Sequence, residues 1–78
     1  MMSDVLIQLF AEVLHLDPSG LNEDSSPDNV KKWDSLAAMD LVAAIEEKFN
    51  VQLSTKEIMK MYTIGRARKT LQGKGVAL

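Results

Sequence analysis

The chain contains no cysteine and only one histidine, His15, among its 78 residues. Without cysteine it can form no disulfide, no thiolate metal site and no cysteine nucleophile. His15 follows an apolar stripe at the predicted end of a helix, where a structural role is typical. No glycine-rich phosphate loop is present either, so we can assemble no catalytic or metal-binding set of residues and expect that the protein is not an enzyme.

Long apolar runs are also missing. No run approaches the roughly 18 residues that a membrane-spanning helix needs, and residues 1–4 lack the basic start of a signal peptide. We therefore expect no membrane span and a cytoplasmic location. An apolar fraction of 46% with 26% charged residues is typical of a globular protein. The length allows one domain only, which we assign to residues 1–78.

Each end of the chain has little charge of one sign. Residues 1–30 contain six acidic residues and no lysine or arginine, whereas residues 51–78 contain six basic residues and the single acid Glu57. Pairing between the two segments explains this distribution as well as a binding surface does. The isoelectric point near 5.2 and the scarcity of aromatic residues among the basic ones lead us to expect no nucleic-acid partner.

Apolar residues at helical spacing predict four helices and no strand. Ser3 is the predicted N-cap of the first helix, and Ser54 and Glu57 have the spacing of a capping box before the third. Gly65 is expected to cost the fourth helix about 1 kcal/mol relative to alanine. The predicted helices cover about residues 3–15, 35–49, 55–61 and 63–72.

The periodicity disappears between Leu16 and Asp34, where prolines, glycine and serines mark turns. A loop of this length is uncommon in so small a domain unless it is functional or held by buried side chains. The candidates for such buried side chains are Leu16, Leu21, Val30 and Trp33. The predicted fold class is therefore all-α: a four-helix bundle with a long loop between helices one and two and a short third helix.

The second predicted helix has two different faces when successive residues are placed about 100° apart. The apolar side, expected to face the core, holds Ala38, Leu41, Val42, Ile45 and Phe49. The opposite side holds Leu36, Asp40, Ala43 and Glu47, flanked by Met39 and Glu46. A small apolar centre within a ring of carboxylates suits a partner with a basic rim. A solvated face with incidental apolar residues is the alternative interpretation.

The pair Asp34-Ser35 stands where the second helix begins. Either side chain could accept hydrogen bonds from the free backbone amides and so act as an N-cap. The same position also suits a phosphate, because a helix N-terminus presents unpaired N–H groups and the positive end of the helix dipole. In that case Ser35 would be an attachment point that a second enzyme modifies.

At these residues the chain resembles the acyl carrier proteins. The resemblance rests on "WDSL", on "IEEKFNVQLS" at the end of the second helix, and on "YTIGRARKTL" as the fourth helix. It implies that a phosphopantetheinyl transferase moves 4'-phosphopantetheine from coenzyme A to Ser35. Asp34 would help that enzyme to position the serine and its metal ion. The thiol of the arm would hold an acyl cargo as a thioester, which supplies the sulfur that the chain lacks.

The resemblance also implies how partner enzymes recognise the carrier, which we expect to be a monomer. Acyl ligases or synthases with basic docking patches would contact the outer face of the second helix. The residues predicted to dock are Leu36, Met39, Asp40, Ala43, Glu46 and Glu47. In this family the acyl chain can fold back between helices two, three and four. The small or flexible residues that would permit such a pocket, or else fill the core, are Ala38, Ala44, Met59 and Met61.

Several positions depart from the general fatty-acid synthesis carriers, which the resemblance would otherwise suggest. Ala37 stands where those carriers usually have an acid, Ala43 replaces a larger apolar residue, and Lys48 reverses a charge. These departures predict a specialised discrete carrier for fatty-acid, polyketide or other specialised lipid biosynthesis. An aminoacyl or peptidyl carrier is an alternative, although Asp34 before the serine argues against the peptidyl type. An unmodified helical interaction module, with Ser35 as a mere cap, is another.

Overall fold

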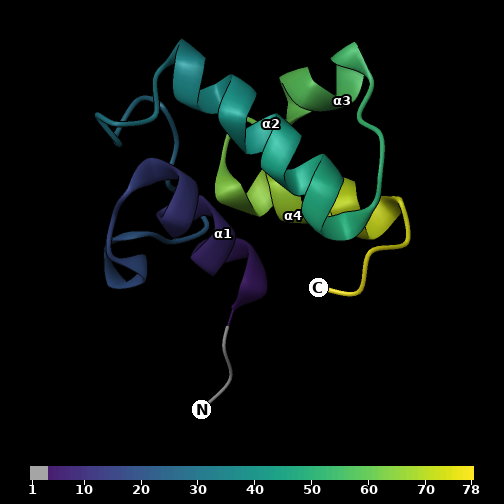
Figure 1. The fold of residues 1–78 in the computed structure, drawn as a ribbon, viewed down its shortest axis with the longest axis horizontal. Helices are drawn as coiled ribbons and strands as arrows, with labels where there is room; N and C mark the ends of the chain where they lie inside the picture. Colours follow the sequence, from purple (N-terminus) through teal and green to yellow (C-terminus); the bar gives the residue numbers. More distant parts are fainter. Residues whose placement is uncertain (1–3) are drawn as a thin grey trace.

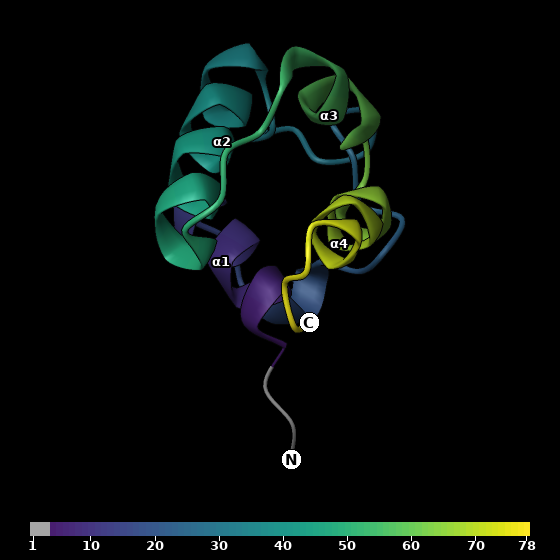
Figure 2. The same ribbon diagram turned by 90° about the vertical axis from the view of Figure 1, so that its right-hand side faces the viewer.

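The computed structural model describes residues 4–78, which form four α-helices and one short 3₁₀ helix, η1. The helices are α1 (Val5–Leu14), η1 (Pro18–Gly20), α2 (Ser35–Phe49), α3 (Thr55–Lys60) and α4 (Ile64–Gly73). The predicted all-α class is therefore confirmed, and α2 has the predicted bounds. Figure 2 shows the four helices arranged around a common centre, with α2 and α4 on opposite sides. Within residues 4–78 no helix is long and apolar enough to cross a membrane.

The helix ends follow from local hydrogen bonds. The Asp4 carboxylate accepts a hydrogen bond of 3.1 Å from the Ile7 amide and is the N-cap of α1. The predicted cap, Ser3, lies outside the described residues. The capping box of Ser54 and Glu57 at the start of α3 is confirmed. His15 ends α1 in the left-handed conformation, with φ 57°, and is exposed to solvent.

The long loop between α1 and α2 is held partly as predicted. Leu21 and Trp33 are buried, whereas Leu16 and Val30 are only half-buried. The ring of Trp33 packs edge-on against Phe10 of α1, with 5.2 Å between the ring centroids. This contact fixes the end of the loop. The loop leads directly into α2 (Figure 1).

The loop is also bonded to the start of α4, which the sequence pattern did not indicate. The amide of Ile64 donates to the Ser25 carbonyl at 3.1 Å, and the amide of Gly65 donates to the Glu23 carbonyl at 2.9 Å. A Cβ atom at Gly65 would lie 3.1 Å from that Glu23 carbonyl oxygen. Gly65 therefore permits a close backbone approach, which compensates for its low helix propensity.

Internal ion pairs confirm in part that the acidic and basic segments of the chain pair with each other. In α4, Arg68 Nη2 lies 2.6 Å from Asp4 Oδ2, and Arg68 Nε lies 2.8 Å from Glu23 Oε1. These two ion pairs connect α4 to the start of α1 and to the loop. Lys74 Nζ lies 2.9 Å from Glu57 Oε2; this pair is within the basic segment itself and joins the end of α4 to α3. The Arg68 side chain is half-buried, so its ion pairs contribute more than fully exposed ones would.

The Arg68 pairs predict a particular dependence of stability on pH. Burial raises the pKa of the Asp4 carboxyl. The hydrogen bond from the Ile7 amide and the interactions with Arg68 together lower this pKa by more, so it lies below its ordinary value of 3.8. The stabilisation from the ionised Asp4 carboxylate is therefore complete at pH values above the pKa of Asp4 in the unfolded chain. It is lost as pH falls through the lower pKa of Asp4 in the folded protein. Arg68→Gln should lower the free energy of unfolding by about 1–2 kcal/mol near neutral pH. It should also reduce the loss of stability between about pH 5 and 3.

Urea denaturation of wild type and Arg68→Gln across this pH range measures both effects. Lys69→Gln is the matched control, because Lys69 is the exposed neighbour in α4 and forms no ion pair within residues 4–78. If the acid dependence of Arg68→Gln equals that of wild type, the Asp4–Arg68 pair does not set it.

Candidate functional site at the start and outer face of α2

Asp34 is the N-cap of α2. Its backbone is extended, with φ −98° and ψ −173°, and its Oδ1 accepts a hydrogen bond of 2.8 Å from the Ala37 amide. The Asp34 carbonyl accepts the first helical hydrogen bond, from Ala38 at 2.9 Å. Of the two capping possibilities that the sequence left open, the structure therefore selects Asp34. Ser35 is the first residue inside the helix.

The Ser35 hydroxyl is not needed to hold the fold. Ser35 is exposed, and its side chain makes no hydrogen bond with any other residue of the described chain, 4–78. It lies in the first turn of a fifteen-residue helix, where unpaired amides and the helix dipole favour negative charge. The local geometry therefore fits a phosphodiester at this oxygen.

The neighbouring side chains give Ser35 a fixed position and free access. On one side, Trp33 is only 5% exposed and packs against Phe10. Its amide donates to the Val30 carbonyl at 3.0 Å, which closes a turn before the helix. On the other side, Leu36 is 72% exposed and projects into solvent. A buried anchor two residues before an exposed serine presents that serine at the end of a rigid helix.

The outer face of α2 exposes most of the residues predicted to dock partners. Leu36 and Met39, which is 71% exposed, form its apolar part. Asp40, Ala43 and Glu47 are exposed on the same side of the helix. We call these five residues the docking face. Figure 2 shows α2 along one border of the molecule, so its outer side is open to a partner.

Glu46 differs from the other acidic residues of α2 because it is half-buried. Its Oε2 accepts a hydrogen bond of 2.9 Å from the Leu53 amide. This bond connects the last turn of α2 to the segment that leads into α3. Glu46 therefore has a structural role in the α2–α3 connection, beside the docking role predicted for it.

The space between α2 and α3 contains a small apolar cavity of about 50 Å³. Ala38 and Met61 line it as predicted, together with Phe10, Trp33, Leu41, Val42, Ile45 and Ile58. The prediction was wrong for Met59, which is 75% exposed, and for Ala44, which faces α1. The cavity is far smaller than the roughly 300 Å³ of typical ligand sites. An adjoining hollow of about 210 Å³, lined by Ala38, Met39, Val42 and Ile58, opens to the surface.

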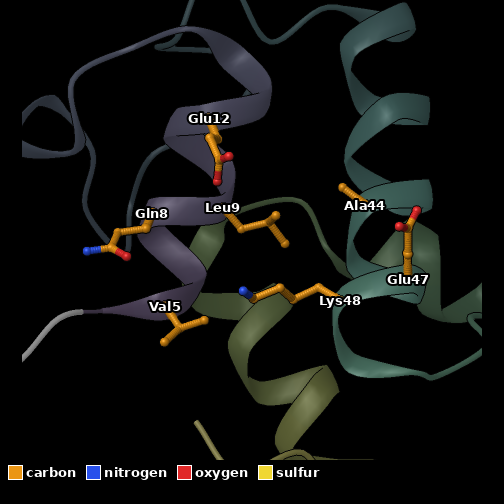
Figure 3. A pocket seen from close by; sticks show the side chains of 7 residues that line it. All are labelled: Val5, Gln8, Leu9, Glu12, Ala44, Glu47 and Lys48. Atoms are coloured by element: carbon orange, nitrogen blue, oxygen red, sulfur yellow. The ribbon is translucent and has the colours of Figure 1, made fainter.

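Ala44 instead belongs to a groove of about 430 Å³ between α1 and α2, which the sequence pattern did not indicate. Figure 3 shows Leu9 pointing from α1 toward Ala44, with the Lys48 side chain extending from α2 toward α1. The other lining residues are Val5, Gln8, Glu12 and Glu47. Glu47 thus belongs both to this groove and to the docking face.

Comparison with known proteins agrees with this geometry. Residues 4–67 match a family model described as a phosphopantetheine attachment site. The chain is 34% identical to the acyl carrier protein of Wolinella succinogenes, over 80% of this chain and 82% of that protein. It is 33% identical to the acyl carrier protein of Chlamydia caviae, over 82% and 83% of the two chains. The chain belongs to the acyl carrier protein family.

Membership of this family identifies the cofactor as covalently attached 4'-phosphopantetheine. Carriers of this family interact with synthases and transferases and are not themselves catalysts. The free hydroxyl at the start of α2 is consistent with this cofactor, because attachment there would disrupt no hydrogen bond of the described residues.

Substitutions of Asp34 separate its capping role from the role in recognition by the transferase that the sequence predicts for it. Asp34→Ala should lower the free energy of unfolding by about 1 kcal/mol, because the Ala37 amide loses its acceptor. Asp34→Asn should keep the cap and change stability by less than about 0.5 kcal/mol. If the carboxylate serves recognition, both variants should accept phosphopantetheine from coenzyme A at least about tenfold more slowly than wild type.

Urea denaturation and initial rates of modification measure the two roles independently. A wild-type rate for Asp34→Asn would limit Asp34 to capping. A slow rate for Asp34→Ala alone would attribute the effect to the disturbed helix start.

Proposed function

We propose that Ser35 carries the phosphopantetheine arm and that the protein is a discrete acyl carrier without turnover of its own. When bound, the arm supplies a thiol that holds an acyl group as a thioester. The observation that carries the proposal is made at the start of α2. Asp34 caps the helix, whereas the exposed Ser35 hydroxyl has no hydrogen bond within residues 4–78. A serine needed only as a cap would occupy the position of Asp34.

The residues of the chain then have distinct tasks in presenting the cargo. Trp33 and Phe10 hold the start of α2 against the core. The free amides of the first turn stabilise the phosphate charge. Because α2 is a rigid element of fifteen residues, the attachment point and the docking face keep one fixed relation. A partner that binds this face therefore finds the root of the arm at a constant place.

The docking face suits enzymes with a basic rim around an apolar contact. Leu36 and Met39 offer apolar area, and Asp40 and Glu47 provide the acidic rim. Ala43, which has a small side chain, allows close approach between them. Charge complementarity of this kind accelerates encounter and sets orientation. We propose that phosphopantetheinyl transferases and acyl ligases or synthases bind here.

We further propose that the carrier is dedicated to one pathway of fatty-acid, polyketide or other specialised lipid biosynthesis. Lys48 supports this, because its exposed side chain adds a cation beside the acidic rim and extends across the α1–α2 groove. A partner matched to this surface needs an acidic or neutral group opposite Lys48, which a uniformly basic docking patch lacks. The aminoacyl, peptidyl and unmodified alternatives are less favoured, because the named relatives are acyl carriers.

The attachment site is tested by mass spectrometry. The wild-type chain is incubated with coenzyme A, Mg²⁺ and a broad-specificity phosphopantetheinyl transferase, and the modified chain is digested and fragmented. We expect one phosphopantetheine on the peptide that contains Ser35. A modification mapped to another serine, or none on a folded chain, would reject the proposed site.

Charge reversal tests the docking face. Asp40→Lys combined with Glu47→Lys should raise the KM of the transferase for the carrier about tenfold, because a basic rim would then meet two cations. Asp24→Lys combined with Glu12→Lys makes the same change of charge on exposed acids outside this face. It should change KM by less than about threefold. Equal effects of both pairs would mean that total charge alone governs binding.

A further inference from the structure

Four basic side chains of α3 and α4 remain after the internal ion pairs are assigned. Arg68 and Lys74 are paired with acids, and Glu57, the acid of this region, is bound by Lys74. The remaining side chains are exposed and form no ion pair within residues 4–78. These residues, which together with Met59 we call the cationic surface, are Lys56, Lys60, Arg66 and Lys69.

The helix geometry places these residues on outward faces. Lys56, Met59 and Lys60 are three and four positions apart on α3 and share one side. Ile58, on the opposite side, lines the small cavity toward α2. Met59 lies beside Lys56 on this side and is 75% exposed, more than any other large apolar side chain of the described residues. On α4, Arg66 and Lys69 lie opposite the buried side of that helix.

The cationic surface and the docking face point in different directions. Figure 2 shows α3 and α4 as neighbours on one side of the molecule, with the length of α2 on the other. Contacts between the two helices, including the Lys74–Glu57 pair, keep them together. A net charge of −2 therefore conceals an acidic side and a basic side. Ile58 of α3 faces α2, so an anionic surface bound at the outward sides of α3 and α4 would not cover the outer side of α2.

The composition of the cationic surface distinguishes between two kinds of anionic partner. Protein interfaces are poor in lysine and rich in arginine and aromatic residues. Here three of the four cations are lysines, and two of them share one side of α3 with a flexible apolar side chain. Lysines act as mobile point charges that keep their heads among lipid headgroups while their stems and an apolar neighbour reach deeper. The surface therefore fits a lipid bilayer better than an acidic protein.

We propose that the cationic surface binds the anionic phospholipid surface of a bilayer reversibly. No segment is inserted: Met59 enters the headgroup region, and the lysines and arginine contribute electrostatic attraction. The Asp28 carboxylate, which accepts a hydrogen bond from the Tyr62 hydroxyl beside α3, opposes this attraction at one edge of the cationic surface by its negative charge. The interaction is consequently weak and sensitive to salt. It goes beyond the carrier function and does not depend on it.

Sedimentation of the holo protein with vesicles tests the proposal. We expect binding to vesicles of phosphatidylcholine with about 30% phosphatidylserine at low salt. Binding to phosphatidylcholine alone should be absent, and binding at about 0.5 M salt should be lost. Lys56→Gln with Lys60→Gln should weaken binding about 25-fold, since each lysine near such a surface contributes about fivefold. Met59→Gln should weaken it severalfold without any change in charge.

The matched control is Lys31→Gln with Lys32→Gln, which removes two exposed cations from the loop before α2. It should change binding by less than about twofold, and circular dichroism verifies the fold of each variant. Equal weakening by both double variants would overturn the proposal, as would absence of binding to the anionic vesicles. Retention on immobilised polyglutamate without vesicle binding would indicate an acidic protein partner and would also overturn it.

Discussion

Ser35→Ala should abolish attachment of phosphopantetheine and leave the stability of the fold unchanged. The modification is lost because the only atom proposed to accept the arm is removed. Stability is retained because Asp34 caps α2, while the Ser35 hydroxyl makes no hydrogen bond within residues 4–78. We expect the free energy of unfolding to change by less than about 0.5 kcal/mol. Intact-mass measurement after the transferase reaction and urea denaturation determine the two quantities.

Ser54→Ala is the matched control, because it makes the same chemical change at a serine that does cap a helix. The Ser54 hydroxyl accepts a hydrogen bond of 3.2 Å from the Glu57 amide. Its loss should cost about 1 kcal/mol but leave the modification complete. The two serines should thus show opposite phenotypes. A Ser35→Ala chain that is still modified, or one destabilised as much as Ser54→Ala, contradicts the roles assigned to them.

Trp33→Ala should cause the largest loss of stability among the variants considered. The Trp33 side chain is 5% exposed, packs edge-on against Phe10 and lines the cavity under α2. Removing it leaves a void that the surrounding side chains can fill only in part, at a cost of about 3–5 kcal/mol. This cost is a large fraction of the free energy of unfolding of a small domain, which is roughly 5–15 kcal/mol. The variant should therefore lose the fixed position of the Asp34-Ser35 pair.

Circular dichroism with urea measures this loss, because Trp33 is the only tryptophan and its fluorescence disappears with the substitution. Leu36→Ala is the control, since Leu36 lies three residues away and is 72% exposed. It should change the free energy of unfolding by less than about 0.5 kcal/mol. Hydrogen exchange near the start of α2 should be faster in Trp33→Ala than in Leu36→Ala. If Trp33→Ala costs less than about 1 kcal/mol, the loop does not depend on this anchor.

The two expected results describe how the site is built. Residues 33 to 36 have four different roles: in order, a buried aromatic anchor, a helix cap, a free hydroxyl and an exposed apolar side chain. Stability and chemistry are thus assigned to different, adjacent residues. A modification of Ser35 would therefore disrupt no hydrogen bond of residues 4–78.

The sequence by itself determined the features that depend on short-range geometry. The bounds of α2 follow from apolar spacing and from flanking polar residues, and the capping box of α3 follows from the positions of Ser54 and Glu57. The separation of Leu36, Asp40, Ala43 and Glu47 from the core also follows from helix periodicity alone. Each of these features depends on residues fewer than about fifteen positions apart.

Where the sequence allowed several residues to fill one structural role, only the tertiary structure decided between them. Whether Asp34 or Ser35 caps α2 depends on backbone angles that both residues could adopt. The close approach at Gly65, the pairing of Arg68 with Asp4 and the outward position of Met59 depend on where distant segments meet. Helix periodicity states which face a residue lies on, whereas the neighbour opposite that face comes from another part of the chain. Long-range packing and hydrogen bonding select that neighbour, which local spacing does not encode.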